Sequence, residues 1–123
     1  MDIRLKRVYE PASARDGYRV LVDRLWPRGI SKKQAKLDEW AKELAPSSQL
    51  RQWFGHEPSR FPEFRRRYID ELRADAPRLK ELRRRARTGT LTLVYSAHDS
   101  EHNDAVVLAE VLRRGLPRSA RRR

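Results

Sequence analysis

The stretch Val20-Leu21-Val22-Asp23-Arg24-Leu25-Trp26-Pro27-Arg28-Gly29 passes from an apolar strand into a polar and aromatic loop. Residues 20–22 are apolar and mostly β-branched, which is typical of a buried strand. Pro27 and Gly29 indicate a turn directly after it. Around this turn the loop offers a carboxylate, two guanidiniums and an indole: Asp23, Arg24, Arg28 and Trp26. The stretch therefore predicts a site at the end of a strand.

The composition indicates one basic domain without cysteine. The chain has 123 residues, of which 37% are charged, and a formal net charge of +12. The excess of cations admits three interpretations: nucleic-acid binding, binding of a small anion, or simple solubility. Because the charge is spread along the chain, we assign most of it to solubility. The absence of cysteine excludes a disulfide framework, a thiolate nucleophile and a cysteine-based metal site.

The N-terminal sequence Met-Asp-Ile-Arg-Leu-Lys lacks the apolar core of a secretory signal. No apolar run approaches the length of a membrane-spanning helix. We therefore expect a cytoplasmic protein with no membrane partner. The sequence does not determine the oligomeric state.

Hydrophobic periodicity predicts alternating strands and helices. Strands are expected at residues 3–8, 18–23 and 90–95. Helices are expected at residues 32–36, 48–54, 61–76, 77–88 and 101–114. The inward residues of the last helix are expected to be Ala105, Val106, Leu108, Ala109 and Leu112. Residues 37–44 fit a helix or a strand, because periodicity does not decide so short a run.

This alternation predicts an α/β fold in which helices flank a mostly parallel sheet. A single compact domain is expected over residues 1–116, followed by a basic tail over residues 117–123 that we expect to be disordered. Parallel sheets bind ligands at the carboxyl ends of their strands. A second polar strand end runs from Tyr95 to Ser100 and continues into residues 101–104. If the two strands are neighbours, their loops share one rim.

Motifs along most of the chain point to a known family. They are residues 22–29 (VDRLWPRG), 45–47 (APS) and 50–56 (LRQWFGH), Phe64 with Tyr68, Glu71-Leu72, and residues 102–105 (HNDA). Together they resemble the DUF488 family, specifically its short YeaO-like branch, over residues 2–116. The resemblance implies a compact α/β domain and favours an extended conformation for residues 37–44. It implies no established activity.

Longer members of that family carry a cysteine-containing motif after the last strand. This chain has Ser96-Ala97-His98 at that point and no cysteine. Thiol chemistry of those relatives is therefore not carried over to this sequence.

Residues with catalytic or binding chemistry gather at the two predicted strand ends. The candidates for catalysis are Asp23, His98 and Asp99, the last two as an acid/base pair. The candidates for ligand binding are Arg24, Trp26, Arg28, Arg51, His56, Tyr95, Ser96 and Asn103. Arginines at such a site favour a phosphate or carboxylate group as ligand.

Structural roles compete with these assignments. Asp23 and Arg24 also fit an internal ion pair, and the three tryptophans fit a core or pocket wall better than a base-stacking surface. His98 and His102 have the i, i+4 spacing of a metal site. They straddle a predicted loop and helix start, however, so no metal is assigned. No phosphate-binding loop or dinucleotide motif is present, and the cofactor, if any, is unknown.

Three functions are compatible with these patterns. The favoured one is binding of a small anionic ligand in a strand-end pocket, with the question of catalysis open. The second is nucleic-acid binding through the arginine-rich residues 65–67, 83–87 and 113–123. It is not favoured, because acidic residues are interleaved with these arginines. The third is an interaction protein without catalytic activity, in which every charge of the motifs is already paired.

Overall fold

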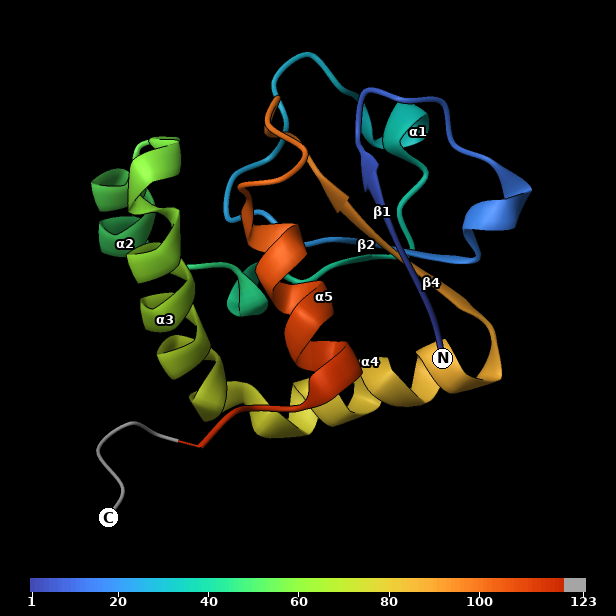
Figure 1. Cartoon of the computed structure of the whole chain (residues 1–123). Helices are drawn as coiled ribbons and strands as arrows, with labels where there is room; N and C mark the ends of the chain where they lie inside the picture. The colour runs from blue at the N-terminus through green and yellow to red at the C-terminus, as the bar shows by residue number, and fades with distance from the viewer. Residues whose placement is uncertain (119–123) are drawn as a thin grey trace.

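A four-stranded parallel sheet forms the centre of the computed structural model, which describes residues 1–118 (Figure 1). The strands are β1 (Asp2–Arg7), β2 (Tyr18–Leu21), β3 (Glu39–Trp40) and β4 (Thr90–Tyr95). Their order in the sheet is β1-β4-β2-β3, and every pair is parallel. The α/β class and the mostly parallel sheet predicted from the sequence are confirmed.

Five α-helices complete the fold of residues 1–118. They are α1 (Lys32–Ala35), α2 (Ser48–Phe54), α3 (Phe61–Leu72), α4 (Ala76–Thr88) and α5 (Asp104–Arg114). Helices α4 and α5 pack on one face of the sheet, α3 packs beside α5, and α2 packs beside α3 (Figure 1). No helix among the described residues has the length and apolar content needed to cross a membrane.

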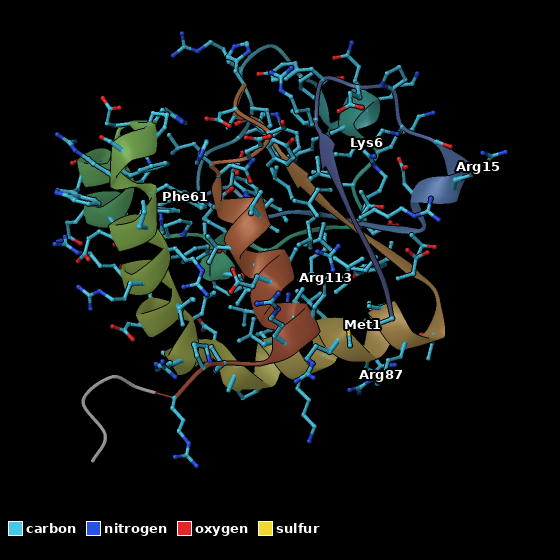
Figure 2. All side chains as sticks on the ribbon, in the orientation of Figure 1. Met1, Lys6, Arg15, Phe61, Arg87 and Arg113 are labelled. Carbon is cyan, nitrogen blue, oxygen red and sulfur yellow. The ribbon has the colours of Figure 1, made fainter. Side chains whose placement is uncertain are left out.

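The core follows from the two-residue period of the strands. Leu91 and Leu93 of β4 join the main core beneath α4 and α5. Val94 instead belongs to a smaller apolar cluster, whose other buried members are Val8, Leu21 and Ala35. Charged side chains such as Arg15 and Arg87 extend from the body of the protein into solvent (Figure 2). The central strand is therefore buried on both faces, as parallel strands usually are.

Several predicted element boundaries need correction. The expected helix over residues 61–76 ends at Leu72, and a short 3₁₀ turn, Arg73–Asp75, separates it from α4. Residues 37–44 contain the two-residue strand β3 followed by a 3₁₀ turn, so the extended conformation favoured by the family resemblance is present at Glu39–Trp40.

The last helix begins later than its periodicity predicts. The Asn103 side chain accepts a hydrogen bond from the Val106 N–H at 2.9 Å and caps the helix, so residues 101–103 belong to the preceding loop. The predicted inward set was wrong at one position, because Val107 is fully buried whereas Val106 is partly exposed. After α5, the Pro117 carbonyl accepts a hydrogen bond from Arg73. Residues 119–123 of the predicted tail lie outside the described residues.

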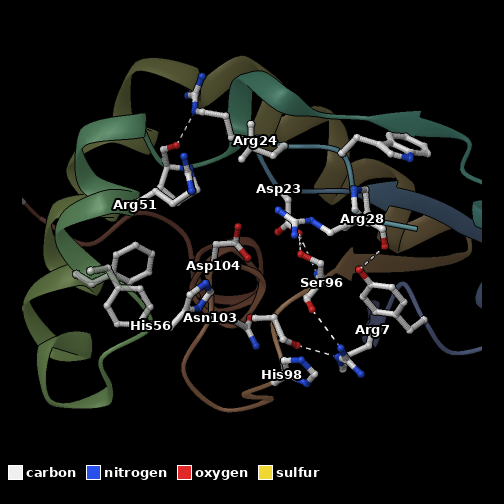
Figure 3. Close-up of a pocket in the computed structure, with 18 residues that line it drawn as sticks. Arg7, Asp23, Arg24, Arg28, Arg51, His56, Ser96, His98, Asn103 and Asp104 are labelled. Carbon is white, nitrogen blue, oxygen red and sulfur yellow. Dashed lines mark hydrogen bonds between the residues drawn. The ribbon is translucent and has the colours of Figure 1, made fainter. Parts of the chain in front are cut away.

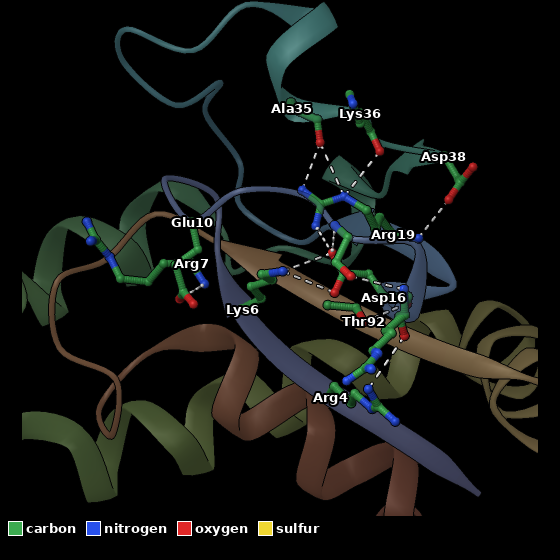
Figure 4. Close-up of polar contacts among 12 residues, drawn as sticks. Arg4, Lys6, Arg7, Glu10, Asp16, Arg19, Ala35, Lys36, Asp38 and Thr92 are labelled. Carbon is green, nitrogen blue, oxygen red and sulfur yellow. Dashed lines mark hydrogen bonds and ion pairs between the residues drawn. The ribbon is translucent and has the colours of Figure 1, made fainter.

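A buried ionic network stands on the face of the sheet opposite α4 and α5 (Figure 4). Arg19, only 4% exposed, donates to Asp16 at 2.6 Å and to the Ala35 carbonyl at 2.8 Å. Lys6 donates to both carboxylate oxygens of Asp16 at 3.1 and 3.2 Å. The Lys36 carbonyl at the end of α1 accepts a further bond from Arg19 at 3.1 Å. The network thus joins β1, β2 and α1.

Replacing Arg19 by methionine is expected to destabilise the fold by about 3 kcal/mol, because it leaves Asp16 and the Ala35 carbonyl short of a donor. Urea unfolding of the purified proteins measures the change. The matched control is Arg84→Ala, which removes an exposed arginine from α4 and should change stability by less than about 0.5 kcal/mol. Equal effects of both substitutions would show that the network contributes no special stability.

Because of the same network, we expect the fold to lose stability at acidic pH. Burial alone would raise the pKa of Asp16, but hydrogen bonds from the Ser13 N–H, Lys6 and Arg19 outweigh it and hold this pKa below its ordinary value. A carboxyl group whose pKa is lower in the folded than in the unfolded state makes its full contribution to stability above the unfolded-state pKa of about 3.9. This contribution is lost as pH falls toward the folded-state pKa. Thermal melts between about pH 6 and pH 3 should therefore show a steeper loss for the unmodified protein than for Asp16→Asn. Parallel pH profiles would contradict this assignment.

Candidate functional site

A pocket of about 880 Å³ opens at the carboxyl ends of the central strands (Figure 3). Strands β2 and β4 are neighbours, so the loops that follow them share one rim, as the sequence led us to expect. The N-terminal end of α5 and one side of α2 close the pocket. Its volume suits a small organic ligand.

Most of the predicted site residues line this pocket. They are Asp23, Arg24, Trp26, Arg28, Arg51, His56, Ser96, His98 and Asn103. Two predicted residues, Tyr95 and Asp99, are not among the lining residues. Tyr95 is 4% exposed, because strand alternation turns its side chain into the main core, where burial raises its pKa. Its assignment to the ligand-binding set is therefore corrected.

Asp23 connects the two strand-end loops through hydrogen bonds. Its Oδ2 accepts hydrogen bonds from the Ser96 N–H at 2.9 Å and from the Ser96 hydroxyl at 2.7 Å. The Trp40 indole N–H donates to the Asp23 carbonyl at 2.7 Å. The internal Asp23–Arg24 ion pair considered from the sequence is absent from the described residues, since Arg24 Nε donates to the Pro46 carbonyl at 2.8 Å instead.

The predicted acid/base pair of His98 and Asp99 does not form. Asp99 pairs with His102, whose Nδ1 lies 2.8 Å from Asp99 Oδ2. The N–H groups of Glu101 and His102 also donate to Asp99, and the Glu101 N–H together with the His102 ring holds the pKa of Asp99 below its ordinary value. This carboxylate shapes the loop that leads into α5. Within residues 1–118, no three histidine or acidic side chains are grouped so as to hold a metal ion.

Asp104 is the acidic site residue that sequence reasoning missed. It is partly buried at the first position of α5 and lines the pocket near Asp23 (Figure 3). Burial raises the pKa of Asp104 well above its usual range, and the neighbouring Asp23 carboxylate raises it further. Asp104 therefore holds its proton to a higher pH than an ordinary carboxyl group. The available signal was the Asn103 cap, which fixes where the first turn of the helix begins.

Four arginines line the pocket, and none of them forms an ion pair within the described residues: Arg7, Arg24, Arg28 and Arg51. Sequence reasoning missed Arg7, whose guanidinium donates to the carbonyls of Ala97 and Ser96. The Arg28 guanidinium donates no hydrogen bond to the described residues, and the buried Nε of Arg51 has no partner among them. By contrast, Arg65 pairs with Glu110 outside the pocket.

An aromatic wall faces these charges. Phe54 and Phe64 stack with their ring centroids 4.3 Å apart, and His56 lies 6.2 Å from Phe54. His56 has a φ of 57°, a left-handed conformation uncommon for a residue with a side chain. Trp26 lines the pocket and donates to the Ile30 carbonyl, whereas Trp53 is not among the lining residues and packs partly against the core. The pocket therefore combines cationic, acidic and aromatic surfaces.

These observations describe a small parallel α/β domain with a strand-end pocket. The family model described as "Inactive DUF488-N3 subclade" matches residues 2–123, and the chain belongs to this DUF488 family. The resemblance inferred from the sequence motifs is thereby confirmed.

Similar proteins share nearly their whole length with this chain. The uncharacterized protein YeaO of Escherichia coli K12 is 50% identical over 113 residues, which cover 92% of this chain and 98% of that protein. The uncharacterized proteins Rv3073c of Mycobacterium tuberculosis H37Rv and Mb3100c of Mycobacterium bovis are each 44% identical over 110 residues, covering 89% of this chain and 92% of each relative. No solved structure matches the chain.

Replacing Asp23 by asparagine should lower the pKa of Asp104, because it removes the nearby negative charge and keeps an acceptor oxygen for Ser96. Side-chain carboxyl carbon shifts followed by NMR during a pH titration measure this pKa. Asp99→Asn is the matched control, since it removes a carboxylate from the same loop region without lining the pocket. An unchanged Asp104 pKa in Asp23→Asn would show that burial alone raises it.

Proposed function

We propose that this protein binds a small anionic ligand in the strand-end pocket. The supporting observation is the group of four pocket arginines that have no carboxylate partner among the described residues. A planar guanidinium recognises a phosphate or carboxylate through paired N–H donors. Arg28 and Arg51 carry most of this capacity, because the hydrogen bonds of Arg7 and Arg24 already fix part of their side chains.

The arrangement of charges separates this proposal from the two alternatives. In an interaction protein without a ligand, the pocket charges would be paired with one another. For nucleic-acid binding, the arginine run on α3 would need to be free. Arg65 pairs with Glu110, however, and Arg66 and Arg67 both pair with Glu63. These pairs reduce the positive potential of that helix face, whereas Arg28 and Arg51 in the pocket have no carboxylate partner among the described residues.

We propose that the pocket binds an anion, and we assign no reaction to it. The family to which the chain belongs is described as inactive. The acid/base pair expected from the sequence is replaced by an Asp99–His102 pair. A binding role requires only the arginines, the carboxyl pair and the shape of the pocket.

A thermal-shift titration with inorganic phosphate, ethyl phosphate and acetate tests the proposal. A bound anion at a hundred times its Kd stabilises the folded protein by about 2.7 kcal/mol, which raises Tm by several degrees. Arg28→Ala should abolish or greatly reduce this shift. The fold should tolerate the substitution, because the guanidinium donates no hydrogen bond within the described residues and the Arg28 carbonyl that binds Tyr9 is retained.

Arg84→Ala is the matched control, because it removes the same charge from α4, outside the pocket. It should leave the anion-induced shift unchanged. A shift that survives in Arg28→Ala, or is lost equally in both variants, would assign the effect to general screening of the +12 charge. Absence of a shift with all three anions would overturn the proposal.

A further inference from the structure

The pocket contains guanidiniums and carboxyl groups that do not pair with each other. Among the described residues, neither Asp23 nor Asp104 forms an ion pair, although Arg24, Arg28 and Arg51 line the same cavity. Figure 3 shows Asp23 and Asp104 between Arg51 on one side and Arg28 on the other. If anion binding were the only task, two carboxyl groups in the same cavity would oppose it. The presence of these carboxyl groups therefore indicates that the pocket recognises a second group on its ligand, besides the anionic one.

The carboxyl pair has acceptor capacity left over. Ser96 donates two hydrogen bonds to Asp23 Oδ2, and no cationic side chain of the described residues pairs with Asp23 or Asp104. Asp104 lies at the beginning of α5, where burial keeps it protonated to a higher pH than usual. A partly buried carboxyl pair binds most strongly to a donor that carries positive charge.

Other charged and titratable groups also face this pair. They are Arg51 and His56 from the α2 region, Tyr68 from α3, and Arg24, Arg28 and His98 from the two strand-end loops. Burial and then the Asp104 and Asp23 charges keep the pKa of Tyr68 well above its ordinary value, so Tyr68 stays neutral.

Resting on the proposed anion-binding function, we propose that the ligand is a zwitterion that carries a protonated amino group beside its anionic group. The anionic group binds the pocket arginines, and the ammonium group binds between Asp23 and Asp104. The ammonium keeps its own protons. The proton on Asp104 leaves to solvent, so that the ammonium group faces the Asp104 carboxylate beside Asp23.

Matched probes test this inference. Alkyl phosphates of two, three and four carbons are compared with the ω-aminoalkyl phosphates of the same length by isothermal titration calorimetry. At least one amino compound should bind about tenfold more tightly than its alkyl partner, the effect expected of one hydrogen bond to a charged group. The advantage should grow as pH rises through the Asp104 pKa and shrink at lower pH.

Asp104→Asn should remove the advantage of the amino group and leave alkyl phosphate binding intact or tighter. Arg84→Ala, which lies outside the pocket, should change neither affinity. A second measurement uses only the unmodified protein: titrations in buffers of different ionisation enthalpy should show protons released with the amino probe and fewer with the alkyl probe. This readout remains informative if the Asp104 variant fails to fold.

The outcomes separate the two proposals. If alkyl phosphates bind as tightly as every amino partner and release as many protons, the zwitterion inference is overturned while anion binding stands. If neither series binds the unmodified protein, anion binding itself fails, and the zwitterion inference fails with it. An amino advantage that persists in folded Asp104→Asn would also overturn the assignment of the ammonium to the carboxyl pair.

Discussion

The parallel pairing of β4 between β1 and β2 is the constraint on which the rest of the structure depends. Its register sets Arg7 opposite Tyr95 and Leu21 opposite Val94, so three strands end at nearly the same level. The chain must then leave the sheet at a single edge, and the polar residues that follow each strand converge there. Because β4 is buried on both faces, a shift of register would expose its apolar side chains, and the pairing is therefore strongly specified.

The two faces of the sheet are stabilised in different ways. On one face, α4 and α5 bury a continuous apolar core. On the other, there is little helix to cover the strands, and the Arg19–Asp16 network with Lys6 takes the place of a larger apolar layer. The carbonyls at the end of α1 complete the hydrogen bonds of Arg19. This satisfies a buried charge that would otherwise be very unfavourable, and it attaches the segment after the pocket loop to β2.

The charges at the pocket edge follow a different pattern from those elsewhere. On the surface, several arginines pair with carboxylates, as where Arg78 pairs with Glu39, Glu43 and Glu81. In the pocket, guanidiniums and carboxyl groups share one cavity without neutralising each other. Hydrogen bonds to carbonyls hold Arg7 and Arg24 in place, and Ser96 holds Asp23. Charges that are fixed in position but not paired suit recognition of a ligand that brings both signs of charge.

The sequence by itself determined the α/β class, the three longer strands and the polar loops at two strand ends, because these depend on periodicity and local composition. The caps at Ser31 and Ser47 are also local, because each side chain accepts a hydrogen bond from a backbone N–H three residues further along the chain. Only the tertiary structure decided which residues share the pocket. Arg7 enters it through the β1–β4 register, and Asp104 through the packing of α5 beside Asp23. The Tyr95 side chain lies in the core and not in the pocket, and Asp99 pairs with His102. Such choices depend on contacts between residues tens of positions apart, and local patterns carry no information about them.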